Sequence, residues 1–204
     1  MTSLTIPISD EAIRALHVGE TVSLSGVMLT ARDAAHKYMV ENFIRTDQVP
    51  ASEQEMYEKL KADLDGGVIY HCGPVVKKEN GTWRFVAAGP TTSIREEVYE
   101  PEVIEHFNVK AVIGKGGMGP NTLKACEEHA AVYLQAVGGA ASLIANAVVE
   151  VLGVYKLEFG VPEAFWKIRV ENFPAVVTMD SHGRSLHDDI LEKSRAVFQR
   201  LMAA

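Results

Sequence analysis

The sequence predicts a single α/β domain in which β-rich segments near the two ends of the chain join a central layer of alternating helices and strands. Helical patterns alternate with short apolar strand patterns over residues 93–157, as they do in α/β units. Strand patterns also occupy residues 21–29 and 166–179. The 204 residues, of which 47% are hydrophobic, suffice for a core that needs no disulfide or metal to fold. We therefore expect one domain over residues 1–204, built on a mixed sheet.

The first third of the chain predicts a strand, two helices and a second strand. Residues 21–29 alternate polar and apolar side chains, which is typical of a half-buried strand. Small and apolar residues at helical spacing predict a helix over residues 34–43, and Asp33 stands in its first turn, where a carboxylate favours the helix dipole. A second helical pattern covers residues 53–64, and the short apolar run at residues 68–72 predicts the next strand.

The remaining elements follow from turn residues and from apolar periodicity. Asn80-Gly81, which lies before an apolar run, predicts a hairpin with a type I′ turn. The expected helices lie at residues 93–107, 121–129, 141–152 and 188–201. Short apolar strands are expected at residues 111–113, 132–134 and 155–157. Two antiparallel strands, separated by a turn at Asn172-Phe173-Pro174, are expected at residues 166–170 and 175–179.

The charge and the apolar pattern exclude several classes of protein. The 20 Lys and Arg against 27 Asp and Glu give a net charge of -7, which argues against a protein that binds nucleic acid through clustered basic residues. No stretch reaches about 18 consecutive apolar residues, and the first residues lack the basic and apolar regions of a signal peptide. We therefore expect a cytoplasmic protein that neither spans nor binds a membrane.

The two cysteines, Cys72 and Cys126, do not form a metal-binding motif. They are too few to hold a tetrahedral zinc ion or a four-iron cluster by themselves. The histidines are not at a metal-binding spacing such as HExxH. We expect both cysteines to be small core residues and no metal ligand to come from this chain.

Three segments place cationic side chains beside glycines or hydroxyls where a strand is followed by a helix. They are residues 30–33 with Arg32, residues 89–95 with Arg95, and residues 113–120 with Lys115. Ligands of α/β sheets bind at this edge, because helix N-termini offer free N–H groups and a partial positive charge. Arginine can grip a carboxylate with two parallel hydrogen bonds, and lysine adds a point charge. Such a set suits a small dianion.

Each segment also has a simpler interpretation. Arg32 and Asp33 could be a surface ion pair at a helix start, worth about 0–1 kcal/mol. A hydroxyl of residues 91–93 could be a helix N-cap. The run GKGGMGP at residues 114–120 lacks the GxxxxGK[ST] spacing of a phosphate loop, and the glycines at residues 138–139 lack the GxGxxG pattern of a dinucleotide site. We therefore expect no nucleotide.

Taken in order, the loop motifs resemble those of the β subunit of class I, iron-sulfur-dependent fumarate hydratase, a module that is also the C-terminal domain of the single-chain enzymes. They are similar, too, to the β subunit of L(+)-tartrate dehydratase. The resemblance runs from about Ile6 to His187. It rests on four runs: RDAAHK from Arg32, GPTTS from Gly89 with Arg95 after it, IGKGGM from Ile113, and AVGGAA from Ala136.

This resemblance implies a swivelling β/β/α fold and the reversible hydration of fumarate to L-malate. It also implies a 4Fe-4S cluster held by three cysteines of an α subunit, which accounts for the small number of cysteines here. The chain would be active only together with that α subunit. The alternative from a different class is a stand-alone module that binds small dicarboxylates without catalysis.

The resemblance further implies roles for individual residues. Arg32, Arg95 and Lys115 would bind the substrate, and Lys115 and Thr91 would take part in catalysis. Cations placed in advance near a carboxylate favour a transition state in which negative charge builds on that carboxylate. A threonine hydroxyl is a weak base and needs activation by a neighbouring group, which the α subunit would provide. We expect Asp33 and His36 to orient Arg32.

One departure from the family pattern concerns the residues after Arg95. Family members often have a methionine there, whereas this chain has Glu96 and Glu97. Two acids beside a substrate-binding arginine could form an ion pair with it or change the electrostatic potential around it. Residues 73–83 also resemble the tartrate dehydratase form. We expect fumarate as the substrate, and tartrate, which would be converted to oxaloacetate, as the alternative.

Overall fold

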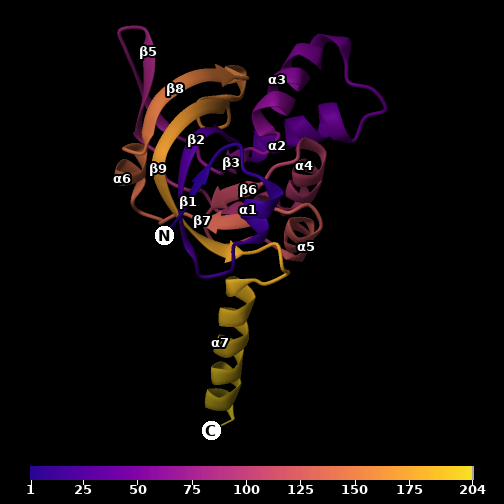
Figure 1. Cartoon of the computed structure of the whole chain (residues 1–204), viewed down its shortest axis with the longest axis vertical. Coiled ribbons are helices and arrows are strands. Elements are labelled where there is room, and N and C mark those ends of the chain that lie inside the picture. Colours follow the sequence, from indigo (N-terminus) through magenta and orange to yellow (C-terminus); the bar gives the residue numbers. More distant parts are fainter. Residues whose placement is uncertain (204) are drawn as a thin grey trace.

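A mixed seven-stranded sheet forms the centre of the structure, a computed structural model that describes residues 1–203 (Figure 1). The strands are β1 (Thr2–Thr5), β2 (Thr21–Thr30), β3 (Val68–Tyr70), β4 (Val75–Glu79), β5 (Thr82–Ala87), β6 (Ala111–Gly114), β7 (Val132–Gln135), β8 (Val148–Tyr155) and β9 (Phe165–Met179). Their order in the sheet is β1-β2-β3-β6-β7-β9-β8, and β4 and β5 form a separate hairpin. The first five of these strands are parallel, whereas β9 is antiparallel to β2, β7 and β8. Because β9 pairs with both β2 and β7, the sheet curls into a partly closed barrel.

Helices cover one face of this sheet. Figure 1 shows α2, α3, α4 and α5 on one side of the strands, and α7 projecting away from the body of the molecule. The α-helices are α1 (Asp10–Arg14), α2 (Asp33–Met39), α3 (Gln54–Leu64), α4 (Glu100–Phe107), α5 (Pro120–Glu128), α6 (Ala141–Ala145) and α7 (Leu186–Met202). A π-helix, η1 (Val40–Ile44), continues α2, and 3-10 helices occur at η2 (Ala51–Glu53), η3 (Ser93–Val98) and η4 (Leu157–Phe159).

Two apolar cores hold these layers together. One core is enclosed by the curled sheet and includes Leu24, Trp166 and Phe173. The other lies between the sheet and the helices and includes Met39 and Phe107. Burial of apolar surface on both faces of a parallel sheet is what makes its strands continuous apolar runs rather than alternating ones. The arrangement confirms the predicted α/β class with a mixed sheet.

Several predicted elements occur as expected. The strand predicted at residues 21–29 is β2, and the hairpin is formed by β4 and β5. Asn80 and Gly81 have φ values of 50° and 84°, and these two positive values are what a type I′ turn requires. The helix predicted at residues 93–107 is interrupted: η3 ends before Tyr99, and α4 then starts with Pro101 in its first turn, a position that proline tolerates.

Three predictions in the last third of the chain are wrong. The strand expected at residues 155–157 is limited to Tyr155, the last residue of β8, because Lys156 has a φ of 54° and Leu157 begins η4. Residues 141–152 were expected to form one helix, but α6 ends at Ala145 and the valine-rich residues after it form β8, which pairs with β9. The turn expected at Asn172-Phe173-Pro174 is absent from the described chain, because β9 runs through it as one strand of 15 residues. Asn172 instead has a φ of 52° and lies opposite the bulge of β2 between Leu24 and Gly26. Pairing between distant segments overrides the local helix pattern after Ala145 and the local turn signal at residues 172–174.

None of the helices within residues 1–203 is long and apolar enough to cross a membrane.

Candidate active site

The three cationic loops meet at one edge of the sheet. Residues 30–33 follow β2, and residues 113–120 follow β6, so both lie at the C-terminal ends of parallel strands. The loop from Gly89 to Thr92 joins them through the backbone. Thr91 N donates to His71 O at 2.7 Å, Lys115 N donates to Thr91 O at 3.1 Å, and Ser93 N donates to Lys115 O at 3.1 Å. Main-chain hydrogen bonds therefore fix Thr91 and Lys115 side by side.

Arg32 lies at the start of α2 and is held by a residue that sequence reasoning missed. Its Nη1 lies 3.2 Å from Glu163 Oε1, and the side chain is 19% exposed. The other oxygen of Glu163 accepts a hydrogen bond from Ala34 N at 3.1 Å and so caps the helix in place of a side chain at Arg32. The guanidinium also fills the space in front of Gly73, where a Cβ atom would lie 2.5 Å from Nη1. A side chain at position 73 would therefore displace the Arg32 guanidinium.

Arg95 lies on η3 and pairs with the first residue of α2. Its Nη2 is 2.9 Å from Asp33 Oδ2, and both side chains are nearly half exposed. Asp33 was expected to orient Arg32, but the structure places its carboxylate on Arg95, because Arg32 turns toward Glu163 instead. The ion pair thus connects two of the three loops.

Lys115 and Thr91 also lie at this edge, and they differ in how exposed they are and in what holds them. The Lys115 side chain is exposed, and its Cδ lies 3.8 Å from where a Cβ of Gly138 would be. Thr91 is half-buried, and its Oγ1 donates to His71 O at 3.0 Å. This bond orients the hydroxyl but does not make it a base, since an amide carbonyl accepts a hydrogen bond without taking the proton.

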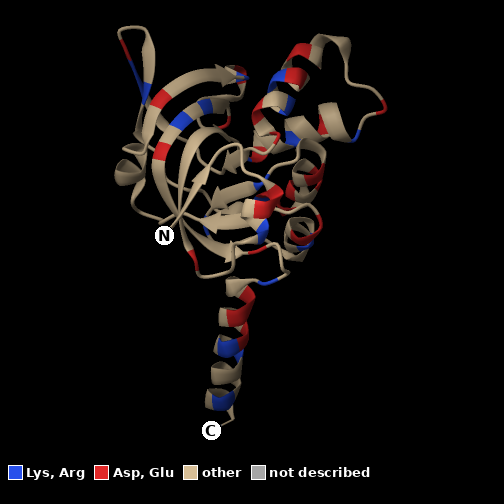
Figure 2. Ribbon diagram, in the orientation of Figure 1, with Lys and Arg blue, Asp and Glu red and all other residues tan. Residues whose placement is uncertain are grey.

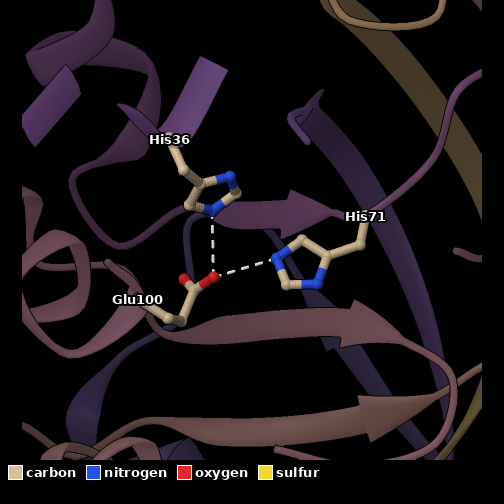
Figure 3. A group of neighbouring side chains, drawn as sticks. All are labelled: His36, His71 and Glu100. Atoms are coloured by element: carbon tan, nitrogen blue, oxygen red, sulfur yellow. Dashed lines mark hydrogen bonds and ion pairs between the residues drawn. The ribbon is translucent and has the colours of Figure 1, made fainter. Parts of the chain in front are cut away.

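A fully buried group of His36, His71 and Glu100 lies beneath the loops (Figure 3). Glu100 Oε2 is 2.9 Å from the Nε2 atom of each histidine. The second ring nitrogen of His36 lies 2.9 Å from Arg32 O, and that of His71 lies 2.8 Å from Ser93 Oγ. Each histidine therefore links the buried carboxylate to the backbone or side chain of one of the three cationic loops.

The group extends toward β7 through two hydroxyls. Tyr133 donates from its hydroxyl to Ser93 Oγ at 2.9 Å, and both side chains are buried. His36 was expected to orient Arg32, and the structure places its ring against the backbone carbonyl of Arg32 rather than against the guanidinium. No sequence signal marked Glu100, which is one of several glutamates in its segment. His71 directly follows a short apolar strand pattern, and that position could have indicated that it lies near the site.

The electrostatics of this group favour a buried ion pair. Burial alone would lower the pKa of His36, but the Glu100 carboxylate and the Arg32 carbonyl outweigh it, so the pKa is raised above 6.5. Burial alone would raise the pKa of Glu100, yet the two histidines lower it to about 2. Both shifts favour the charged forms, a protonated His36 beside an ionised Glu100.

The same three residues offer ligand atoms within 4.8 Å of one another, which is a spacing that a metal ion could use. However, both N···O distances to Glu100 are 2.9 Å, the length of direct charge-assisted contacts. Contacts of this length account for the grouping of the three side chains without an ion. We therefore interpret the group as an ion-pair network.

Glu96 and Glu97 have separate roles. Glu97 caps the N-terminus of α5: its carboxylate accepts from the backbone N–H groups of Gly119, Asn121 and Thr122 at 2.7–3.2 Å. Glu96 is fully buried, and its Oε1 lies 3.8 Å from Arg95 Nη2. Burial raises the pKa of Glu96. Of the two acids, Glu96 is the one near Arg95.

The cysteines do not fit an iron-sulfur cluster. Cys72 belongs to the core inside the curled sheet and Cys126 to the core under the helices, and both are free and buried. Burial raises the pKa of the Cys72 thiol to about 12 and also raises that of Cys126, whereas a cluster binds thiolates. Both residues are core residues, as the sequence predicted.

We expect His36→Gln to lower the free energy of unfolding by about 3 kcal/mol at pH 6, because it removes a buried cation from the Glu100 carboxylate. Since the pKa of His36 is raised in the folded state, its contribution is complete below pH 6.5 and is lost as the pH rises through the folded value. The stability difference between wild type and variant should therefore shrink with increasing pH. Urea unfolding over a pH series measures it.

His106→Gln is the matched control. Partial burial and Lys61 lower the pKa of His106, so its contribution is lost as the pH falls. The difference between wild type and this variant should grow with pH. If the His36→Gln difference also grew with pH, the ion-pair interpretation would be wrong.

Comparison with known proteins identifies relatives over nearly the whole chain. Residues 2–190 match the family described as Fumarase C-terminus. A putative fumarate hydratase class I of Geobacillus stearothermophilus is 51% identical over 193 residues, which are 94% of this chain and 34% of the relative. The chain thus spans about a third of the length of that protein.

Two further relatives have nearly the length of this chain. A putative L(+)-tartrate dehydratase subunit beta of Methanocaldococcus jannaschii is 42% identical over 196 residues, which cover 95% of this chain and 93% of the relative. The L(+)-tartrate dehydratase subunit beta of Escherichia coli K12 is 38% identical over 184 residues, with 90% and 85% covered.

Proposed function

This chain belongs to the Fumarase C-terminus family, and from that premise we propose that it is the β subunit of a heteromeric hydro-lyase that hydrates fumarate reversibly to L-malate. The observation that carries the proposal is the meeting of Arg32, Arg95 and Lys115, with Thr91, at one edge of the sheet. Three cations in one place suit a substrate with two carboxylates.

The cations would act on the charge that develops during the reaction. In the dehydration direction, a proton leaves the carbon next to a carboxylate, the hydroxyl of the neighbouring carbon leaves with another proton as water, and a double bond forms between the carbons. Negative charge shifts onto the carboxylate as the first proton leaves. Arg32, Arg95 and Lys115 favour that charged state over the ground state, because they are already in place.

Thr91 is proposed to move a proton at the reacting carbon. Its hydroxyl is held by His71 O and lies next to Lys115 through the backbone hydrogen bond between them. Activation of this hydroxyl requires a base, which we assign to the α subunit. The 4Fe-4S cluster is likewise assigned to the α subunit, because Cys72 and Cys126 do not fit it.

Tartrate is the second candidate substrate. The two relatives of which this chain covers 93% and 85% are named as tartrate dehydratase beta subunits. Tartrate is also a dicarboxylate with a hydroxyl next to the proton that leaves, so the same cations would serve its conversion to oxaloacetate.

The experiment is anaerobic co-expression with an α subunit of a class I hydro-lyase, followed by assays of fumarate loss and of oxaloacetate formation from tartrate. We expect fumarate hydration by the complex and by neither chain alone. A higher kcat/KM for tartrate would assign the second substrate. A complex that converts neither acid would contradict the hydro-lyase proposal, and tight calorimetric binding of malate by the isolated chain would favour the stand-alone binding module.

A further inference from the structure

The last helix, α7, has an apolar face with no cover in the described structure. It begins after Ser185, whose side chain accepts a hydrogen bond from Asp188 N at 3.3 Å, and none of its 17 residues is buried. Its base is anchored where the His187 ring packs against Gly117, and the rest projects away from the body (Figure 1). The exposed large apolar side chains, with 46–72% of their surface accessible, are Ile190, Leu191, Val197, Phe198, Leu201 and Met202.

These side chains form one stripe along α7. Ile190 and Leu191 are seven residues before Val197 and Phe198, and Leu201 follows at helical spacing, so they line one side of the helix. A helix of this length gains most of its stability from packing an apolar face, since an isolated one is marginal in water. A continuous exposed apolar stripe of this kind marks an interaction site.

The charges of α7 are divided between its two halves. The half near the body carries Asp188, Asp189 and Glu192, and the half near the C-terminal end carries Lys193, Arg195 and Arg200. Figure 2 shows the change from acidic to basic along the projecting helix. Two copies side by side in parallel would oppose like charges, whereas two antiparallel copies would place each acidic half beside a basic half.

We propose that α7 pairs antiparallel with α7 of a second copy of this chain and thereby holds two copies together. Ser194 is at the middle of the helix, so a twofold axis there places Ile190 of one copy opposite Phe198 of the other and Leu191 opposite Val197. The helix is about 25 Å long, and each body lies at the Ser185 end, so antiparallel pairing puts the two bodies at opposite ends of the pair.

The family model ends at residue 190, so the stripe from Leu191 onward lies outside the matched region. The inference is independent of the proposed function, because it uses none of the site residues.

Charge reversal in the full-length chain tests the proposal. We expect the wild type to be a dimer by sedimentation equilibrium. Reversing the acidic half with Asp188→Lys and Glu192→Lys gives both halves of the helix a net positive charge, although Asp189 remains. Reversing the basic half with Lys193→Glu, Arg195→Glu and Arg200→Glu makes the helix acidic throughout. Each variant alone should lose the dimer, and an equal mixture of the two should recover it as a heterodimer.

Cysteine cross-linking gives the orientation. Ser194→Cys should form a disulfide between copies under mild oxidation, whereas Leu201→Cys should not, because antiparallel pairing separates the two copies of residue 201. The wild type, whose cysteines Cys72 and Cys126 are buried, is the control for cross-linking without an added cysteine. A parallel pair would cross-link at both positions and overturn the proposed orientation. A wild type that is monomeric alone, or whose α7 is covered only by the α subunit, would overturn the proposal itself.

Discussion

Replacing Arg95 by alanine is expected to lower kcat/KM of the assembled enzyme by about 10²- to 10³-fold, the usual effect of removing one group that stabilises developing charge. The fold should remain intact, because Arg95 is about half exposed and its ion pair with Asp33 contributes only about 0–1 kcal/mol. Steady-state kinetics with fumarate and urea unfolding of the same preparation measure the two quantities.

Arg169→Ala is a matched control for this experiment. Arg169 is half exposed like Arg95, and its Nη2 lies 3.0 Å from Glu150 Oε2 in an ion pair between β9 and β8, outside the three loops. We expect its kcat/KM to equal that of the wild type. If Arg95→Ala and Arg169→Ala had equal kinetics, Arg95 would not belong to the site.

Replacing Glu100 by glutamine should have the largest effect on stability, a loss of about 3–5 kcal/mol in the free energy of unfolding. The change keeps the shape of the side chain but leaves protonated His36 buried without its counter-charge, at a place where Glu100 itself is fully buried. Because the pKa of Glu100 is lowered to about 2 from 4.5, its contribution is complete above pH 4.5 and is lost as the pH falls toward 2. The deficit of the variant should therefore shrink in acid.

Glu128→Gln controls for the loss of a glutamate that pairs with a cation. Glu128 Oε1 lies 3.5 Å from Lys124 Nζ on the exposed side of α5, so we expect a change of at most about 0.5 kcal/mol. Elemental analysis of the wild type adds a second readout. Stoichiometric zinc that disappears in Glu100→Gln would show a metal centre in place of the ion-pair network.

The loops of the site could be predicted from the sequence because their signals are local. Arg32 and Lys115 each stand at the end of a strand pattern, and parallel strands bring such ends to one edge. Arg95 stands next to turn and hydroxyl residues, but its loop follows the separate hairpin and is joined to the edge by backbone hydrogen bonds. The hairpin at Asn80 and Gly81 is equally local, since the backbone conformation of two residues decides it.

The residues that hold the cationic loops in place, Glu163 and Glu100, could not be predicted, because they come from distant parts of the chain. Glu163 caps α2 from 129 residues away in the sequence, and nothing in its own neighbourhood marks it. Glu100 is distinguished from nearby glutamates only by burial between His36 and His71.

Long-range pairing also explains two of the errors in the predicted secondary structure, those at residues 141–152 and 172–174. The residues after Ala145 become a strand because β9 is there to pair with them. β9 stays continuous through Pro174 because β2 accompanies it on both sides of the bulge. Local patterns carry no information about such partners.

A structure of the assembled enzyme with bound malate tests the central claim most directly, which is that this chain supplies the cations that grip the dicarboxylate. We expect Arg32, Arg95 and Lys115 to lie within hydrogen-bonding distance of the two carboxylates, with the Thr91 hydroxyl next to the carbon that exchanges its proton. Malate held only by residues of the α subunit, with the three cations directed elsewhere, would contradict it.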